Sequence, residues 1–349
     1  MRIFSSSRTV NLNSQVVAGG LSYSKQIQAL KRAVPIVVAT PGRLIDLIQK
    51  KHIKLDDIEI TVLDEADQMA DMGFLPDVKR ILDLTKPGGQ RMLFSATLDK
   101  DVDSLVKKYL KNPVTHSLAN EKSTAGNMTH HVLILEQAHK DLITSQIAAR
   151  KGKSIFFVRT KHGADKLTKR MNEAGVAVGA LHGGKTQAQR SRVLEAFKSG
   201  HTNALVATDV AARGIHVDDV SLVVHVDSPE SHKDYLHRAG RTARAGAEGV
   251  VVTLATHSQR RSVHGMTAKA GITLKESKVR PMDANLVSIT GAVEPSGIAI
   301  AMGPAKPERN HSSQPRRGSG APGRAHRGER PYKAGKKAGF KGRERRGAK

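Results

Sequence analysis

Short apolar runs alternate with amphipathic segments over residues 34–118. The strand-like runs are Ile36–Ala39, Ile60–Leu63 and residues 91–94. After the first run, Leu44, Ile45, Leu47 and Ile48 recur at helical spacing, which predicts an amphipathic helix. Strands separated by helices of this length are typical of a parallel α/β sheet.

A second block with the same alternation follows a polar stretch at residues 119–131. Its predicted strands are residues 154–158, residues 176–178, Ala204–Ala207 and residues 222–225. The Asn, Ser, Thr and Gly of the polar stretch are typical of a linker. We therefore predict two parallel-sheet α/β domains, at residues 1–118 and 132–275, joined by this linker.

The remaining residues, 276–349, are predicted to form a low-complexity basic tail. From about residue 303 the chain is mainly Gly, Pro, Arg, Lys and Ser. Such a composition buries too little apolar surface to offset the entropy lost on ordering, so we expect disorder there. Residues 276–302 are modestly apolar, and the sequence suggests no function for them.

The chain is strongly cationic, with 57 Lys and Arg against 32 acidic residues and a net charge of +25. Residues 303–349 contain 15 basic and 3 acidic residues, a net charge of +12, which leaves +13 for the rest. A polyanion is the natural partner. Nucleic acid is favoured over anionic lipid because no apolar amphipathic stripe accompanies the charge.

The chain has no Cys, which excludes disulfides and thiolate metal sites and fits a reducing cytoplasm. The N-terminus lacks the apolar core of a secretory signal. No stretch approaches the ~18 uninterrupted apolar residues of a membrane span. We therefore expect a cytoplasmic protein without a membrane partner.

Carboxylates close the apolar run Ile60–Leu63, in the order Asp64-Glu65-Ala66-Asp67. A parallel strand that ends in acids delivers them to the sheet edge where open α/β folds bind ligands. Two acids there suit Mg²⁺-nucleotide chemistry, because one holds the water shell of the metal and the other takes a proton from an attacking water. The alternative is an ordinary first turn of a helix, where acids favour the macrodipole.

Hydroxyls follow the next run, at Ser95-Ala96-Thr97. If the two strands are neighbours, their ends present acids and hydroxyls to one crevice. Hydroxyl capping of a local helix is the alternative for Ser95 and Thr97.

Thr40-Pro41-Gly42-Arg43 combines a helix N-terminus with an arginine, which suits phosphate binding. By itself, an ordinary N-cap followed by Pro is the better interpretation. Gly19-Gly20 is equally compatible with a turn.

In the second block, Thr208-Asp209 follows an apolar strand and leads to Gly214. Arg238, Arg241 and Arg244 then recur every three residues after His237. Planar guanidiniums of fixed charge suit a transferring phosphoryl group. A solvated basic face is the alternative, although the flanking glycines and small residues weaken it.

Taken together, these motifs resemble the DEAD-box RNA helicases, superfamily 2 motor proteins with two RecA-like domains. The resemblance covers about residues 15–260, with all motifs in the order of the family. Within the family, the bacterial subgroup with basic C-terminal tails is the most similar.

The resemblance implies ATP and Mg²⁺ as cofactors. It implies that Asp64 holds the water shell of Mg²⁺, that Glu65 activates the hydrolytic water, and that Arg241 and Arg244 are arginine fingers. The implied catalytic residues are Asp64, Glu65, Asp67, Ser95, Thr97, His237, Arg241 and Arg244. The implied nucleotide-binding residues are Asp209, Gly214 and Arg238.

The resemblance also implies contacts with the RNA backbone, which give affinity without sequence preference. The implied RNA-binding residues are Gly19, Gly20, Thr40, Pro41, Gly42, Arg43 and Thr208. A monomer is expected, and no protein partner is implied.

The chain departs from the family pattern at its beginning. The family has a glutamine-bearing adenine motif, a G-x-x-x-x-G-K-T phosphate loop and a Pro-Thr-Arg-Glu-Leu-Ala segment before the position of Gly19, and none of them is present here. A match to the phosphate-loop pattern does occur at residues 179–186. We interpret it as a decoy, because a phosphate loop follows the first strand of its α/β unit and precedes its acidic strand. The first domain is therefore expected to be incomplete.

Two functions remain open. One is an ATP-dependent RNA helicase that unwinds short duplexes by local strand separation. The alternative is a non-catalytic RNA-binding or annealing protein that uses the second domain and the basic tail, with binding that falls steeply with salt.

Overall fold

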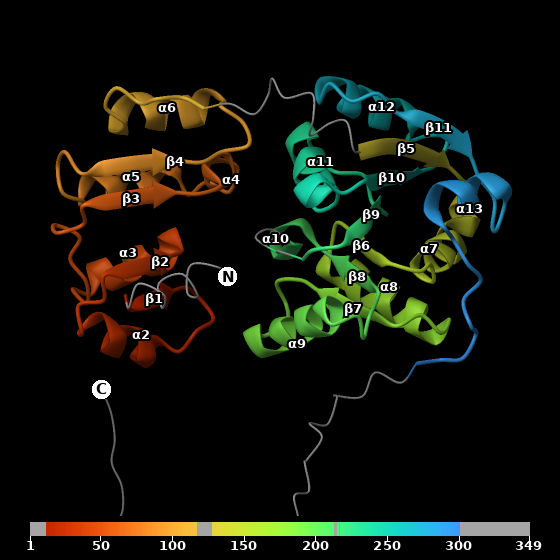
Figure 1. Ribbon diagram of the computed structural model, residues 1–349, viewed down its shortest axis with the longest axis horizontal. Helices are drawn as coiled ribbons and strands as arrows, with labels where there is room; N and C mark the ends of the chain where they lie inside the picture. Colours follow the sequence, from red (N-terminus) through yellow and green to blue (C-terminus); the bar gives the residue numbers. More distant parts are fainter. Residues whose placement is uncertain (1–11, 117–127, 213–214, 216, 301–349) are drawn as a thin grey trace, which may run out of the picture. The chain divides into compact units, whose positions relative to one another are not determined.

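The computed structural model describes residues 12–116, 128–212, 215 and 217–300. By compactness the chain divides into two units, Met1–Met302 and Gly303–Lys349, and all of the described residues belong to the first. We call residues 12–116 the first lobe and residues 128–300 the second lobe. Each lobe alternates strands and helices along the sequence (Figure 1).

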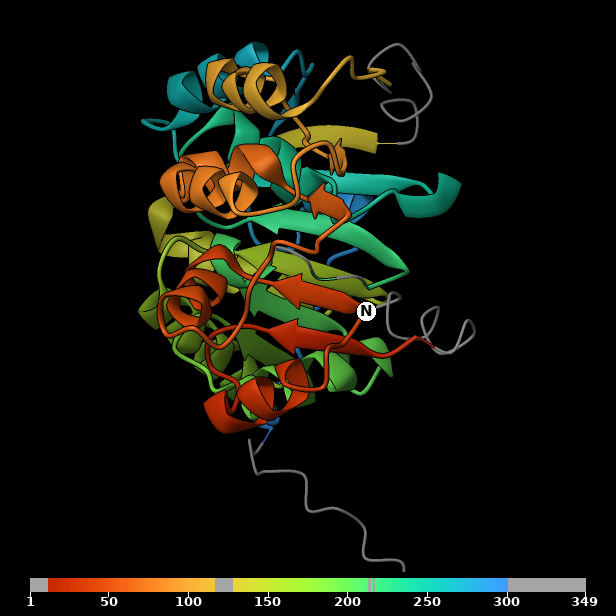
Figure 2. The ribbon, with the colours of Figure 1, turned by 90° about the vertical axis from the view of Figure 1, so that its left-hand side faces the viewer.

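The first lobe contains two parallel pairs of strands, β1 with β2 and β3 with β4. Its strands are β1 (Ser14–Val17), β2 (Ile36–Ala39), β3 (Ile60–Leu63) and β4 (Gln90–Leu93). Its helices are α2 (Tyr23–Leu30), α3 (Pro41–Gln49), α4 (Ala66–Asp71), α5 (Leu75–Asp83) and α6 (Lys100–Tyr109). Figure 2 looks onto this lobe, whose strands are drawn as red and orange arrows.

Local sequence signals explain where the helices of the first lobe begin. Pro41 occupies the first turn of α3, where its fixed φ suits a helix start and its missing N–H costs nothing. Asp99 caps α6, because its side chain accepts hydrogen bonds from the backbone N–H groups of Asp101 and Val102.

The two faces of β3 lie in different environments. Leu63 packs against a core that includes Val78, Leu82 and Leu105. Ile60 and Val62, which point to the other face, are 57% and 52% exposed. Side chains alternate across a strand, so the β3–β4 pair has one covered and one open face among the described residues.

The second lobe is built on a seven-stranded parallel sheet in the order β11-β5-β10-β9-β6-β8-β7. Its strands are β5 (Met128–Ile134), β6 (Lys153–Phe157), β7 (Val178–Leu181), β8 (Ala204–Ala207), β9 (Val220–His225), β10 (Gly249–Ala255) and β11 (Lys275–Lys278). Its α-helices are α7 (Lys140–Ala148), α8 (Lys161–Glu173), α9 (Gln187–Lys198), α10 (Asp209–Ala212), α11 (His232–Ala239), α12 (Arg260–Lys269) and α13 (Ala284–Thr290). Short 3-10 turns are η1 (Gln137–His139) and η2 (Arg244–Gly246).

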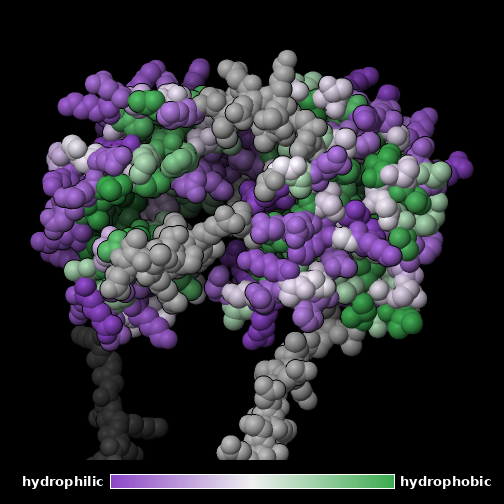
Figure 3. Space-filling view, in the orientation of Figure 1, coloured by the Kyte–Doolittle hydropathy of each residue, from purple (hydrophilic) through white to green (hydrophobic). Residues whose placement is uncertain are grey.

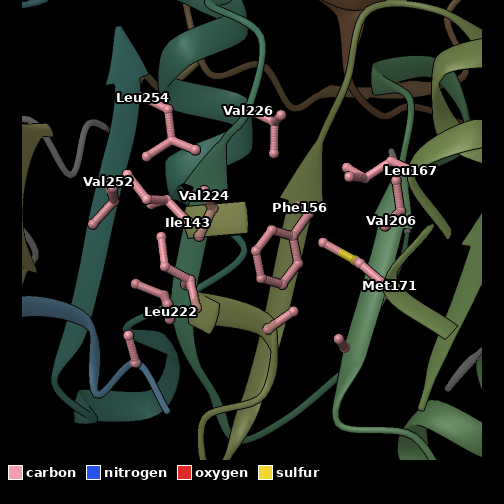
Figure 4. Close-up of a cluster of buried hydrophobic side chains, with 14 of the residues drawn as sticks. Ile143, Phe156, Leu167, Met171, Val206, Leu222, Val224, Val226, Val252 and Leu254 are labelled. Carbon is pink, nitrogen blue, oxygen red and sulfur yellow. The ribbon is translucent and has the colours of Figure 1, made fainter. Parts of the chain in front are cut away.

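Apolar side chains fill both sides of the second sheet. Phe156 points into one cluster, with Ile143, Met171 and Val224 (Figure 4). Phe157, the next residue, points into the opposite cluster. A sheet covered on both faces explains why its strands are continuous apolar runs.

The predicted parallel α/β architecture is confirmed in both lobes. Strands β2, β3 and β8 occupy their predicted residues, whereas β7 begins at Val178 instead of residue 176. The prediction missed β1, β5, β10 and β11. In β5, Thr129, His130 and His131 interrupt the apolar pattern, although the strand pairs along its whole length with β10.

The boundary predicted for the basic tail differs from the structure. Strand β11 pairs with β5 at the sheet edge, and α13 buries Leu286. Beyond α13, the backbone N–H groups of Gly297 and Ile300 donate to carbonyls of residues 174 and 172 on the second lobe. Residues 276–300 therefore belong to the folded lobe, because their short apolar segments are buried by contacts far away in sequence.

The linker prediction also ends too late, since β5 already begins at Met128. The rest of the predicted linker and residues 303–349 lie outside the described residues. Hydrophilic side chains cover much of the surface displayed in Figure 3. Within the described ranges, no helix combines the length and the hydrophobicity that crossing a membrane would need.

Candidate functional site

A tight corner at the end of β3 sets the position of the first two acids. Glu65 adopts a left-handed backbone conformation, with φ 52°, and occupies the N-cap position of α4. Its N–H donates to Asp64 Oδ1 at 3.0 Å, and the N–H of Ala66 donates to the carbonyl of Phe94 at 3.1 Å. A left-handed non-glycine residue costs about 1 kcal/mol or more, so the surrounding structure enforces this corner. It leaves Asp64 exposed and Glu65 half-buried at the carboxyl end of the strand.

Asp67 lies one turn further on and is buried, with 1% of its surface exposed. Its Oδ2 accepts hydrogen bonds from the N–H and the hydroxyl of Thr97, both at 3.0 Å. Its own N–H donates to Ser95 Oγ at 3.2 Å, and Ser95 Oγ donates to the carbonyl of Thr97. The predicted meeting of acids and hydroxyls at one edge therefore occurs, and Asp67 is the acid at its centre.

His237 of α11 completes this network. Its Nε2 lies 3.7 Å from Asp67 Oδ2, an ion-pair distance when the imidazole is protonated. Burial raises the pKa of Asp67, but the interactions with His237, Thr97 and Ser95 outweigh it and hold that pKa well below its usual range. Asp67 is thus a fixed negative charge that joins α4, β4 and α11.

Arg238 has a different environment from its neighbour His237. It is 2% exposed, and its guanidinium grips Asp209 through two hydrogen bonds of 2.6 and 2.8 Å. A third bond goes to the carbonyl of Asp227, and the guanidinium lies over the ring of Phe157. This bidentate pair ties α11 to α10, so the two predicted nucleotide-binding residues Asp209 and Arg238 occupy each other's polar groups.

Arg241 and Arg244 converge on one backbone carbonyl. Arg241 Nη1 donates to the carbonyl of Ile215 at 3.0 Å, and Arg244 Nη1 donates to the same oxygen at 3.4 Å. Arg241 and Arg244 are both partly buried. Burial lowers the pKa of Arg244, and the charge of Asp218 partly opposes this effect. The structure therefore brings these two arginines to one backbone oxygen.

The residues predicted to bind RNA from the first lobe form a separate group. Gly19 and Gly20 form a turn, which requires glycine at the second position because its φ is 75°. Thr40 is the N-cap residue of α3 but makes no side-chain capping bond. Arg43 lies over the ring of Tyr23. In the part of the chain that the structure describes, no hydrogen bond or ion pair joins these residues, or Pro41 and Gly42 beside them, to the acids.

Thr208 stands at the carboxyl end of β8 and starts α10. Its N–H donates to the carbonyl of Leu181, and its own carbonyl accepts from Ala211 and Ala212. Gly214, the remaining predicted nucleotide-binding residue, lies outside the described residues.

The phosphate-loop pattern at residues 179–186 is occupied by contacts within the protein. Lys185 Nζ pairs with Asp165 Oδ1 at 2.8 Å, and His182 Nε2 contacts the same oxygen at 3.0 Å. The N–H of Gly184 donates to His182 Nδ1, and Thr186 closes a capping box at the start of α9. Lys185 and the N–H of Gly184 are therefore bonded to other groups of the protein. This agrees with the interpretation of residues 179–186 as a decoy.

A cavity of about 820 Å³ lies away from these residues, at the amino end of β4. Arg91 in its wall donates to the carbonyls of Leu82 and Tyr109, and Lys108 pairs with Asp83. Arg91 and Lys108 thus already have partners within the protein. The cavity is not part of the candidate site.

The sequence prediction missed Lys233, which contacts Asp71 and Asp99 beside the Asp67 network. One signal was available in the sequence. Asp71 follows Asp67 by four residues, and Lys233 precedes His237 by four, so each pair lies on one helix face.

Family comparisons match both lobes. The model described as DEAD/DEAH box helicase matches residues 2–105, and the helicase conserved C-terminal domain matches residues 135–246. The "DEAD-box ATP-dependent RNA helicase 9" of Oryza sativa subsp. japonica is 39% identical over 80% of this chain and 45% of its own length. The "probable ATP-dependent RNA helicase DDX17" of Homo sapiens is 40% identical over 70% of this chain and 34% of its own. The chain thus spans less than half the length of these relatives.

Among solved structures, S. cerevisiae Dbp5 bound to RNA and ADP BeF3 matches with a TM-score of 0.70 and 28% identity. The match covers 80% of this chain and 74% of that one.

Proposed function

Since this chain belongs to the DEAD-box family of helicases, we propose that it couples ATP hydrolysis to the local unwinding of RNA duplexes. Matches of 39% and 40% identity to relatives named as ATP-dependent RNA helicases support this proposal. So does the likeness to a structure that contains RNA and ADP BeF3.

The contact network of Asp67 is the observation that carries the proposal. It joins the acidic corner after β3, the hydroxyls after β4 and His237 of α11 through distances of 3.0 to 3.7 Å. A group that contacts both lobes is positioned to report the state of one lobe to the other. We assign Asp67, Ser95, Thr97 and His237 to this coupling of nucleotide state to RNA binding.

Glu65 is the proposed general base. It takes a proton from water while the water oxygen bonds to the γ-phosphorus of ATP and the bond to the ADP oxygen breaks. Arg241 and Arg244 stabilise the negative charge that this transfer spreads over the phosphoryl oxygens. Their shared contact with the carbonyl of Ile215 holds them side by side. Asp209, Gly214 and Arg238 are proposed to shape the nucleotide site.

The residues present fit a Mg²⁺ ion held through water. Among the described residues no cluster of three or more His, Asp or Glu side chains is arranged to hold a metal. Mg²⁺ in nucleotide sites usually keeps several waters and takes one or two carboxylates plus phosphate oxygens. Asp64, exposed at the carboxyl end of β3, supplies such a carboxylate. The bound ion would neutralise charge on the phosphates of ATP.

The proposed RNA contacts come from backbone-binding residues of both lobes. They are Gly19, Gly20, Thr40, Pro41, Gly42, Arg43 and Thr208. Contacts of this kind favour RNA of any sequence. The net charge of +25 supports a polyanionic partner.

We also propose a subgroup, a cellular location, an oligomeric state and a domain division for this protein. The +12 charge of residues 303–349 supports the bacterial subgroup with basic tails. The absence of Cys supports a cytoplasmic protein, and we propose that it acts as a monomer. We also propose a first domain at residues 1–118 and a second domain that extends to about residue 300, since β11 and α13 pack onto the second sheet.

RNA-stimulated phosphate release is the direct test. We expect the chain to release phosphate from ATP faster when RNA is added, and Glu65→Gln to reduce the rate by about 10²-fold or more, because it removes the base but keeps the shape. Glu59→Gln, at the other end of the β3 region, is the matched control and keeps the wild-type rate. No release above background contradicts ATPase activity for this chain. RNA binding without release favours the annealing function instead.

A further inference from the structure

Lys233 contacts two carboxylates of the first lobe from its place on α11. Its Nζ lies 3.2 Å from Asp71 Oδ1 and 2.5 Å from Asp99 Oδ2. The lysine side chain is only 17% exposed. The hydrogen bond with Asp99 raises the pKa of Lys233 and lowers that of Asp99, so both groups stay charged.

The contact belongs to a pattern between two helices. Asp67 and Asp71 are separated by four residues on α4, and Lys233 and His237 by four residues on α11. The first residue of one pair contacts the last residue of the other, since Asp67 lies 3.7 Å from His237 and Asp71 lies 3.2 Å from Lys233. Residues four apart share a helix face. The acidic face of α4 therefore lies against the basic face of α11 over one helical turn.

We propose that Lys233 is a positioning residue that holds α11 in register against α4 and the start of α6. In this register His237 stays within reach of Asp67. The inference rests on the proposed function, because Arg241, the proposed arginine finger, directly follows α11. Lys233 itself touches neither nucleotide nor RNA in this role.

The contact is ionic, so its strength depends on the salt concentration. Asp71 and Asp99 are 45% and 27% exposed, so salt screens their attraction to Lys233 in part. Without the lysine, the carboxylates of Asp71 and Asp99 lose the cation that both of them contact. Neutralising Lys233 therefore removes an attraction and leaves a repulsion, which favours separation of α11 from the first lobe.

Asp99 divides its two oxygens between two roles. Oδ1 caps α6 by accepting from the N–H groups of Asp101 and Val102, and Oδ2 accepts from Lys233. Serine at this position keeps a capping oxygen but removes the charge. Asp99→Ser therefore separates the contact with Lys233 from the stability of the helix.

Energy transfer between two dyes on the full chain tests the proposal. The chain has no Cys, so Lys107→Cys in the first lobe and Lys169→Cys in the second lobe provide unique labelling sites. Both side chains are more than three-quarters exposed. We expect Lys233→Gln at low salt to lower the ratio of high-transfer to low-transfer molecules about threefold to tenfold, the effect of a partly exposed ion pair. Asp99→Ser should act in the same direction.

A matched control separates this contact from a general loss of charge. Lys140 is 13% exposed and pairs with Asp227 at 3.3 Å, entirely within the second lobe. Lys140→Gln should leave the transfer ratio unchanged, and Lys233→Arg should keep the wild-type ratio because it keeps the positive charge. Equal ratios for Lys233→Gln and Lys140→Gln in proteins of wild-type circular dichroism would overturn the proposal.

The measurement is independent of ATP hydrolysis. It is made without nucleotide, so a chain that releases no phosphate still supports or overturns the role of Lys233. Conversely, unchanged energy transfer in a chain that hydrolyses ATP rejects the Lys233 contact and leaves the proposed function intact.

Discussion

The carboxylate of Asp67 stays ionised although it is 1% exposed. Burial alone would favour the neutral acid, but the N–H and hydroxyl of Thr97 and the side chain of His237 stabilise the charge. The sequence placed an acid and hydroxyls at neighbouring strand ends. It did not indicate that Asp67, and not Asp64 or Glu65, is the buried one.

His130 predicts a pH dependence at the residue scale. Burial lowers its pKa from 6.5 to about 4. The unfolded chain therefore binds more protons between these two values than the folded chain, and the free energy of unfolding falls as the pH drops through this range. Because the ring is only part-buried, we expect a loss of about 1–2 kcal/mol for this residue between about pH 7 and about pH 4.5.

Urea unfolding of wild type and His130→Gln at both pH values measures this difference. The free energy of unfolding of the variant should fall less on acidification, while other histidines contribute equally to both proteins. An identical fall in the two proteins would show that His130 is not the group responsible.

At the scale of elements, α11 is fixed to the second sheet by a buried tyrosine. Tyr235 Oη lies 2.9 Å from His130 Nδ1 of β5, and its ring packs edge-on against His225 of β9. Since Lys233, His237 and Arg241 all lie on this helix or directly after it, the tyrosine sets the rotation of the surface that α11 presents.

Removing this hydroxyl should loosen the helix with little loss of packing. Tyr235→Phe keeps the ring but leaves His130 without its partner, so we expect a loss of about 1 kcal/mol in the free energy of unfolding. Chemical denaturation checks the value. In a His130→Ala background the same substitution should cost almost nothing, and a full cost there would rule out the hydrogen bond as the cause.

Strand β5 was missed by the sequence pattern for a physical reason. Strand β5 carries Thr129, His130 and His131, yet it pairs with β10 on one side and with β11 on the other. The pairing satisfies its backbone groups, and neighbouring side chains such as Tyr235 contact the polar ones. Periodicity records only the apolar positions of a strand, so such a segment is visible only after its partners are known.

At the scale of the whole molecule, residues 275–300 make the second lobe larger than the sequence suggested. Val279, Leu286 and Ala292 lie in the same buried cluster as Phe156. Gln146, which is 1% exposed, accepts from the N–H of Met282 and donates to Glu294. This segment is therefore part of the core and not an appendage.

Two truncations test this assignment. A chain that ends at Leu274 loses β11, α13 and their buried side chains, and we expect its free energy of unfolding to fall by about 3–5 kcal/mol. A chain that ends at Met302 keeps them and should unfold like the full chain. Similar urea midpoints for both truncations would place residues 275–300 outside the cooperative core.

The sequence by itself determined the presence of two α/β lobes and the chemistry at the ends of several strands. Runs such as Ile60–Leu63 followed by Asp64-Glu65 are local, because strand periodicity and chain connectivity alone place the acids at a strand terminus. The ordered motifs from Gly19 to Arg244 also sufficed to indicate the family, since each motif is contiguous in sequence.

Only the tertiary structure decided which of these groups meet. The burial of Asp67 depends on Ser95 and Thr97, which follow another strand, and the contacts of Lys233 with Asp71 and Asp99 join residues more than 130 positions apart. The same holds for β11 and α13, whose weak apolar pattern becomes a core only against the rest of the second lobe. Burial and charge pairing depend on distance in space, and a sequence pattern records only distance along the chain.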